Sequence, residues 1–274
     1  MRRAALLLLP CIPLLAALYL FVRDYGERTV RFVVYRPTTS HFYVTRPIPA
    51  GGKIEGAEDA AGIARVGAVS SGIGLVCPQI DRANPNGYRI FADGVWFDSD
   101  GTDRTPKGDL RLGQAGDLPF CADFDGDGRA DDGVFRAGEW LVSTRARGDG
   151  PTLRFGFGQA GDQPVVVNLA GRGNGTDRHN VVYGVYRAGV WHLDTDGDGN
   201  ADAAHNFGGD PADVARLIPR WSSETKLPEG YSLLLFRRGT WYLKPDPEGA
   251  EILTFGFGQP GDVPWVAYSP RIPR

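Results

Sequence analysis

The sequence lacks the patterns that identify helical, nucleic-acid-binding or catalytic proteins. No apolar stripe at i, i+3 and i+4 persists for three turns, so little helix is expected. The net charge is −3 and Lys and Arg form no run, which argues against a nucleic-acid partner. Gly-x-Ser-x-Gly, His-Glu-x-x-His and phosphate-binding glycine loops are missing, and the four histidines fall at unrelated repeat positions. We therefore expect no catalytic constellation and no enzyme activity.

Cysteine is also scarce, with three in 274 residues. Cys11 lies in an apolar N-terminal stretch, and no Cys-x-x-Cys or Cys/His spacing suggests a zinc site. We expect Cys77 and Cys121 to be two buried thiols. A disulfide between them in an oxidising compartment is the alternative, because the sequence cannot place their Cα atoms within bridging distance.

The N-terminus carries a long apolar run. Two arginines precede an uninterrupted apolar segment, residues 4–22, which as a helix is about 28 Å long and just crosses a bilayer core. No Ala-x-Ala pattern follows, so we expect residues 1–23 to be an uncleaved signal anchor. A cleaved signal peptide and a lipoprotein acylated at Cys11 are the alternatives. Residues 24–274 should then be periplasmic or extracellular, membrane-anchored, or secreted if the segment is cleaved.

Glycine and proline, by contrast, are abundant at 38 and 20 residues, and both punctuate short strands and turns. A Gly-x-Trp element recurs at spacings of 44, 51 and 50 residues, beginning at Gly94, Gly138, Gly189 and Gly239. A second element, Gly-Gln-x-Gly-Asp-x-Pro, begins at Gly113, Gly158 and Gly258 and is reduced to Gly208-Gly209-Asp210 in the intervening copy. Segments 155–166 and 255–266 are identical at nine of twelve positions, so the chain is a repeat protein.

These elements divide residues 24–274 into five repeats of four short strands. The repeats run at about 27–86, 87–133, 134–182, 183–230 and 231–274. In the second repeat the expected strands are Tyr88–Phe91, Val95–Phe97, Leu110–Leu112 and Pro119–Ala122. Four strands in about 45–50 residues is the size of a β-propeller blade. We therefore predict an all-β propeller of four-stranded blades after one transmembrane helix, with a β-sandwich or β-solenoid as the alternative.

The end of the chain indicates how such a ring would close. The last strand, residues 264–268, would expose two aromatic side chains and a valine along an open sheet edge if it stayed unpaired. We expect it to be an outer strand that pairs with residues 29–34 and completes the first blade. The tryptophan of each Gly-x-Trp element is expected to pack between sheets and not to contact a ligand.

Two Asp-rich segments carry the strongest chemical signal. Each has aspartates at positions 1, 3, 5 and 9 of a nine-residue loop, with glycine at position 6. Ca²⁺ takes six to eight hard oxygen ligands, and alternate residues of a curled loop point their carboxylates inward. The carbonyl of position 7 adds a ligand. The predicted metal ligands are Asp123, Asp125, Asp127, Arg129, Asp131, Asp194, Asp196, Asp198, Asn200 and Asp202.

These loops differ from an EF-hand, which has a bidentate glutamate at position 12. Val134 and His205 stand there instead, so we expect two Ca²⁺ sites in loops between strands. The alternative is that the Asp/Gly runs only form turns. Four carboxylates within nine residues repel one another without a cation, which favours the metal. The order of up and down strands also predicts that both loops lie on one face.

Together the motifs resemble the FG-GAP or VCBS-type repeats of bacterial surface proteins, which are related to the integrin α-chain propeller. The resemblance covers about 31–270 and rests on the Phe-Gly-x-x-Gly-Asp-x-Pro element and the Asp loops. It implies calcium ligands at the four aspartates of each loop. The chain has five recognisable repeats where seven are usual in that family.

The resemblance also implies a function: a calcium-stabilised, non-catalytic binding or adhesion scaffold outside the cytoplasm, anchored to a membrane, with a protein or glycan ligand. The alternatives are a propeller-based enzyme that acts on polysaccharide, which would need convergent acids and bases in a pocket, and a sugar-binding lectin with aromatic-lined pockets.

Overall fold

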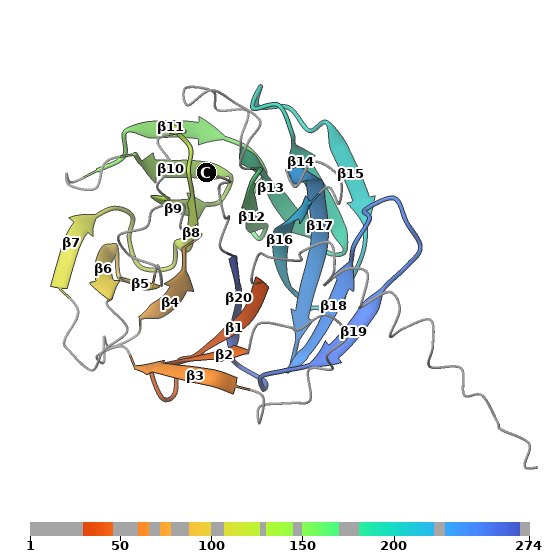
Figure 1. Ribbon diagram of the computed structural model, residues 1–274. Helices are drawn as coiled ribbons and strands as arrows, with labels where there is room; N and C mark the ends of the chain where they lie inside the picture. The colour runs from red at the N-terminus through yellow and green to blue at the C-terminus, as the bar shows by residue number, and fades with distance from the viewer. Residues whose placement is uncertain are drawn as a thin grey trace, which may run out of the picture.

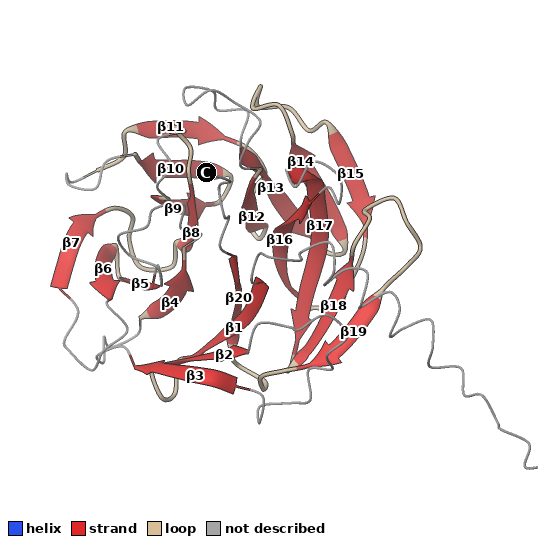
Figure 2. Cartoon of the chain, viewed as in Figure 1, coloured by secondary structure: helices blue, strands red, loops and turns tan. Residues whose placement is uncertain are grey.

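The computed structural model describes residues 30–45, 60–65, 72–77, 88–99, 107–126, 130–144, 150–169, 181–221 and 228–268. Every element in these ranges is a strand, and the strands form five four-stranded antiparallel sheets around a common centre (Figures 1 and 2). The predicted all-β, five-bladed propeller is therefore confirmed. The expected transmembrane helix at 4–22 lies outside the described residues, and within the described ranges no helix has the length and apolar character to span a bilayer.

Each blade contains four strands, which are named below in order from its inner to its outer edge. The first blade is β20 (Val263–Tyr268), β1 (Val30–Arg36), β2 (His41–Thr45) and β3 (Ala60–Arg65). The second is β4 (Ile73–Val76), β5 (Tyr88–Ala92), β6 (Val95–Ser99) and β7 (Lys107–Arg111). The third is β8 (Leu118–Ala122), β9 (Asp131–Arg136), β10 (Glu139–Ser143) and β11 (Leu153–Gly156). The fourth is β12 (Gln163–Asn168), β13 (Val181–Arg187), β14 (Val190–Asp194) and β15 (Ala203–Asn206). The fifth is β16 (Val214–Trp221), β17 (Pro228–Arg237), β18 (Thr240–Lys244) and β19 (Leu253–Gly256).

Strand β20 closes the ring, but as an inner strand. It pairs with β1 in antiparallel register from Val30↔Tyr268 to Tyr35↔Val263, so the predicted pairing of the two chain ends is confirmed. It also contacts β4 and β16, the inner strands of the adjacent blades (Figure 1). The prediction of an outer strand is therefore wrong. Each Gly-Asp-x-Pro strand enters the following blade at its centre, so one sequence repeat supplies three strands of one blade and the inner strand of the next.

The two glycine motifs recur together because they pack on each other. Ala137 and Gly138 form the β9–β10 turn with φ of 50° and 96°, the left-handed values that a type I′ hairpin requires. A Cβ on Gly138 would lie 2.6 Å from the carbonyl oxygen of Gly158, so only glycine permits this approach. The Phe157 N–H donates to the Gly138 carbonyl at 2.8 Å, and Trp140 Nε1 donates to the Phe157 carbonyl at 2.9 Å.

The motif tryptophans are core residues, as predicted. All four side chains are 0% exposed, and the residues are Trp96, Trp140, Trp191 and Trp241. All four lie in apolar clusters that combine side chains of neighbouring blades. Each indole N–H donates to a backbone carbonyl immediately before the next glycine turn, which satisfies the buried donor.

A set of Asp–Arg pairs joins the inner strand of a blade to its second strand. In the third blade Arg136 Nε and Nη2 donate to Asp117 at 2.7 and 2.6 Å, and the Asp117 side chain is 1% exposed. The same pair recurs as Arg36–Asp262, Arg187–Asp162 and Arg237–Asp213. In the second blade Gly72 and Ala92 stand at the two positions, so both partners are replaced together.

At least one side-chain link crosses each seam between adjacent inner strands. The links are Cys77–Cys121 (β4 to β8), Asn168–Asp123 (β12 to the end of β8), Gln163–Ala215 (β12 to β16), Arg216–Pro264 (β16 to β20) and Trp265–Gly74 (β20 to β4). The inner strands of different blades are not paired with each other in a sheet. Their facing edges are therefore held by side chains and packing.

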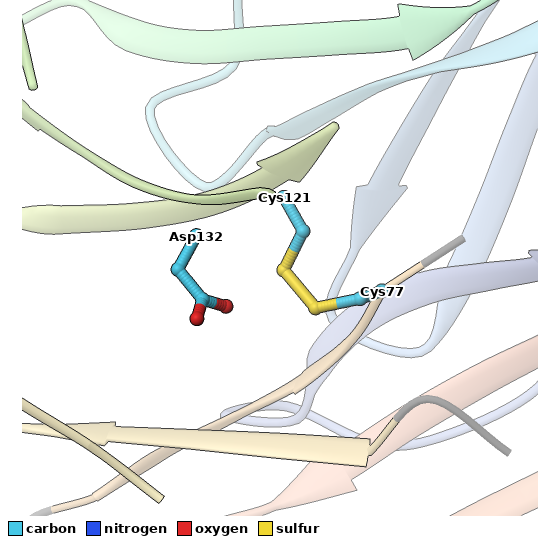
Figure 3. A group of neighbouring side chains, drawn as sticks. All are labelled: Cys77, Cys121 and Asp132. Carbon is cyan, nitrogen blue, oxygen red and sulfur yellow. A yellow bond between two sulfur atoms is a disulfide. The ribbon is translucent and has the colours of Figure 1, made fainter. Parts of the chain in front are cut away.

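The disulfide at the first seam corrects an expectation. Cys77 and Cys121 are bonded with Cα atoms 5.3 Å apart, so the expectation of two free thiols is wrong (Figure 3). The ring places β4 next to β8, a neighbourhood that the 44-residue separation does not reveal. Asp132 lies beside the disulfide in Figure 3 and forms an ion pair with Arg89. Because both sulfur atoms are oxidised, this group is not a thiolate metal site.

Candidate functional site

The first Asp-rich loop connects β8 to β9 in the third blade. The carboxylates of Asp123, Asp125 and Asp131 converge, with one oxygen of each within 4.8 Å of the others. Asp123 and Asp131 are each 6% exposed, whereas Asp125 is exposed to solvent. The other two predicted ligands of this loop, Asp127 and Arg129, lie outside the described residues.

The second loop connects β14 to β15 in the fourth blade and repeats this arrangement. The carboxylates of Asp194, Asp196 and Asp202 again converge within 4.8 Å. Asp194 is fully buried. Asp198 is not part of the group: its carboxylate accepts hydrogen bonds from the backbone N–H and side-chain amide of Asn200 at 2.7 and 2.9 Å. These bonds lower the pKa of Asp198, which is exposed to solvent.

The first aspartate of each loop also organises the turn. Asp194 Oδ1 accepts hydrogen bonds from the N–H groups of Asp196 and Gly197, and Oδ2 accepts from Gly199 N at 2.6 Å and from the Tyr183 hydroxyl. In the first loop Asp123 Oδ1 accepts from Gly126 N at 2.7 Å. The hydrogen bonds that form each turn thus also hold three carboxylates near one point.

The ninth aspartate closes each loop in the same way. Asp131 Oδ2 accepts from Phe124 N at 2.7 Å, and Asp202 Oδ2 accepts from Thr195 N at 2.7 Å. Both bonds join position 9 to position 2, so the identical sequence spacing produces identical closure. The donor sets are all carboxylate oxygens, which fit a hard divalent cation such as Ca²⁺ and do not fit a soft one.

Tyr183 links the second loop to the core. Its ring packs on Trp140 and Phe155 of the third blade, with centroids 5.5 and 5.0 Å away. Burial, together with the hydrogen bond to Asp194, raises the pKa of Tyr183 well above its usual value. The hydroxyl is therefore a permanent donor, which fixes the orientation of the buried carboxylate at the first position of the loop.

A cleft of about 170 Å³ lies between the two loops. Phe124, which stands between Asp123 and Asp125 in the sequence, lines one side, and Gly197–Gly199 line the other. Leu153 and Phe155 of β11 and Val181 and Tyr183 of β13 complete its apolar lining. Because both loops border the same cleft, the prediction that they lie on one face is confirmed.

No role was expected for any of the four histidines, yet the structure gives His205 specific partners in two other segments of the chain. His205, which is 8% exposed, contacts the Tyr231 hydroxyl through Nε2 at 2.9 Å and Glu248 through Nδ1 at 2.8 Å. Burial lowers the pKa of His205, and the facing glutamate only partly offsets this. The three residues come from separate parts of the fourth and fifth blades. No short-range spacing in the sequence signals the cluster.

Comparison with known proteins identifies no family for this chain. No protein-family model and no curated protein matches the chain. A chain in the crystal structure of BBS1N in complex with ARL6DN, soaked with lead, is similar with a TM-score of 0.40 and 13% identity, over 69% of this chain and 59% of that chain. A chain in the mercury-soaked form is similar with a TM-score of 0.33 and 13% identity, over 66% and 58%. This chain thus matches less than two thirds of the length of either.

Proposed function

We propose that this protein is a calcium-stabilised, non-catalytic binding scaffold of the FG-GAP/VCBS type. The observation that carries the proposal is the pair of Asp triads, which have the same spacing, the same closing hydrogen bonds and the same convergence within 4.8 Å. Negative charges on three carboxylates at one point repel one another, and a divalent cation between them removes that repulsion. Ca²⁺ accepts the irregular oxygen shells that such loops provide, with water completing them.

The closed ring supports the scaffold role. A ring whose seams are all linked presents its loops on a rigid frame, and binding residues in proteins commonly lie on loops held by such a frame. The disulfide supports a location outside the cytoplasm, because disulfides persist in oxidising compartments. We propose that residues 1–23 anchor the ring to a membrane, with the ring on the periplasmic or extracellular side.

Calcium titration tests the proposal. Full-length protein stripped with a chelator should bind Ca²⁺ at two sites by calorimetry. Binding to the folded state alone stabilises it by about 2.7 kcal/mol per site at a hundredfold excess over Kd. For a chain of this size that corresponds to about 5–11 °C in melting temperature per site. No heat at millimolar Ca²⁺, together with an unchanged melting temperature, would remove calcium from the proposal.

A double variant identifies the site. Asp125→Ala with Asp196→Ala removes one exposed carboxylate from each triad and should abolish most of the calcium-induced shift in melting temperature. Glu251→Ala is the matched control, since Glu251 is an exposed acid outside both loops. The control variant should respond to Ca²⁺ as the unmodified protein does. Equal responses of the double variant and the control would place the calcium elsewhere.

A further inference from the structure

The cleft between the two Asp loops has the dimensions and lining of a binding pocket. Its volume of about 170 Å³ is close to that of an engineered protein cavity of about 150 Å³ that holds benzene, so one six-membered ring or one leucine side chain fits it. Five apolar side chains form its wall, from Phe124, Leu153, Phe155, Val181 and Tyr183. Such a wall stabilises an apolar occupant through desolvation.

The backbone N–H groups at the rim already have partners within the chain, because those of Gly197 and Gly199 donate to Asp194. A sugar ring seated in the cleft would bury several hydroxyl groups against an apolar wall. Apart from the Asp198 and Arg154 side chains, few polar groups line the cleft to meet them, which is costly. An apolar side chain carries no such cost. The lining therefore favours a protein occupant over a glycan.

The acidic residues at the mouth of the cleft indicate which type of residue would stand beside the apolar side chain of the partner. Asp198 lines the mouth of the cleft and is exposed, and Asp125, Asp196 and Asp202 are exposed in the flanking loops. Among the described residues that line the cleft, Arg154 is the one cation, and it forms an ion pair with Glu139 at 3.1 Å. Asp198 is not part of the convergent group formed by the other three aspartates of its loop. A basic residue is thus the complement of this rim.

We propose that the cleft binds one large apolar side chain of a protein partner, and that Asp198 at its mouth pairs with a basic residue beside that side chain. The inference rests on the proposed function as a binding scaffold and gives it a site and a partner chemistry. The loop that carries Asp194, Asp196 and Asp202 also forms one wall of the cleft, so Ca²⁺ that orders this loop would strengthen binding.

Short capped peptides test the site on the full-length protein. Signals from the Val181 methyl groups, recorded by NMR with Ca²⁺ present, should shift saturably with acetyl-Lys-Phe-amide. The shift should be far smaller with acetyl-Lys-Ala-amide. Binding of acetyl-Glu-Phe-amide should be about two- to fivefold weaker, the range expected for one exposed ion pair. Methyl glucoside should give no shift. A saturable shift with methyl glucoside and none with the peptides would overturn the protein partner, and no shift with any probe would overturn the site.

Two variants and one control locate the binding. Leu153→Trp fills the cleft and should abolish the shift, and Ile252→Trp enlarges an exposed apolar side chain outside the cleft and should not. Asp198→Asn keeps the shape and should remove the preference for lysine over glutamate. A preference that survives in Asp198→Asn overturns the role of that carboxylate, even if Leu153→Trp fails to fold.

The calcium arm separates this inference from the proposed function. Repeating the peptide titration after chelation should weaken binding of acetyl-Lys-Phe-amide. If Ca²⁺ raises the melting temperature but no peptide shifts the Val181 signals, the cleft inference falls and calcium stabilisation stands. If the peptides bind equally with and without Ca²⁺, the proposed coupling falls, and the site itself stands.

Discussion

Replacing Trp265 with alanine should destabilise the whole ring, because this side chain joins the last strand to three others. Trp265 is 8% exposed on β20, which pairs with β1. Its Nε1 donates to the Gly74 carbonyl of β4 at 2.8 Å. The guanidinium of Arg216 on β16 lies 4.1 Å from its ring centroid.

The expected cost follows from these contacts. Truncation of a buried tryptophan to alanine costs about 3–5 kcal/mol, and the lost hydrogen bond and cation–π contact are part of that loss. At about 2–4 °C per kcal/mol the melting temperature should fall by about 6–20 °C. Trp265→Phe keeps an aromatic ring but removes the N–H that donates to the Gly74 carbonyl. Its melting temperature should therefore lie between those of the unmodified protein and Trp265→Ala. Circular dichroism during heating measures the melting temperatures of the two variants, and urea unfolding measures their free energies of unfolding.

Controls decide whether the effect concerns closure. Ile252→Ala removes an exposed apolar side chain and should change the free energy of unfolding by less than about 0.5 kcal/mol. Deleting residues 262–274 removes all of β20 and should lower the melting temperature of the entire domain in one transition. A truncated protein that keeps the full-length melting temperature would refute the reasoning, because it would indicate an open array in which each blade contacts only its neighbours.

Three further predictions concern the seams, acid stability and topology. Replacing Cys77 and Cys121 with serine should lower stability by about 2–4 kcal/mol in denaturant titrations, since the bridge closes a long loop; equal midpoints would contradict this. Burial opposes ionisation of Asp213, but hydrogen bonds, above all from Arg237, outweigh it and lower its pKa below the ordinary value of 3.8. The contribution of ionised Asp213 to the free energy of unfolding is therefore complete above about pH 4 and is lost as the pH falls below that value. Asp213→Asn should make the free energy of unfolding fall less steeply with pH in this acid range. An unchanged fall would exclude the Asp213–Arg237 pair as its source. A reporter fused after Arg274 should be active only in the form that works outside the cytoplasm, and a mature N-terminus found near residues 18–24 would contradict the anchor.

The parts of the fold that sequence predicted depend on local patterns. Turn glycines, alternating apolar residues and the motif tryptophans recur within single repeats, so strands such as β5 and β6 fall within about two residues of expectation. The pairing of the chain ends also followed from a local argument, because an apolar edge strand needs a partner. Its inner position did not follow, since that depends on how all five blades join.

Long-range contacts between side chains were the main omission. Arg36 and Asp262 are 226 residues apart, and Trp265 and Gly74 are 191 residues apart. The Asp–Arg pairs nevertheless left a signal. An arginine stands two residues before the glycine of Gly-x-Trp in the third, fourth and fifth blades, and an aspartate follows the glycine turn in each. In the second blade Gly72 and Ala92 replace the aspartate and the arginine together, which also indicates that these two positions form a pair.

The candidate site was predicted in outline. Regular spacing identified both loops and predicted that the aspartates at positions 1, 3, 5 and 9 converge, of which those at positions 1, 3 and 9 do so among the described residues. The orientation of Asp198 was not predictable, because its carboxylate has a nearby alternative partner in Asn200. The cleft was also missed, since its walls come from β11, β13 and two loops that only the ring brings together.

Diffraction from crystals of the full-length protein grown with calcium would test the two metal sites without an intermediate step. We predict one anomalous peak between Asp123, Asp125 and Asp131 and a second between Asp194, Asp196 and Asp202, each about 2.3–2.6 Å from the carboxylate oxygens. At saturating Ca²⁺, two loops without a peak, their carboxylates bonded only to backbone N–H groups and water, would contradict the calcium sites and leave the Asp loops as turns alone.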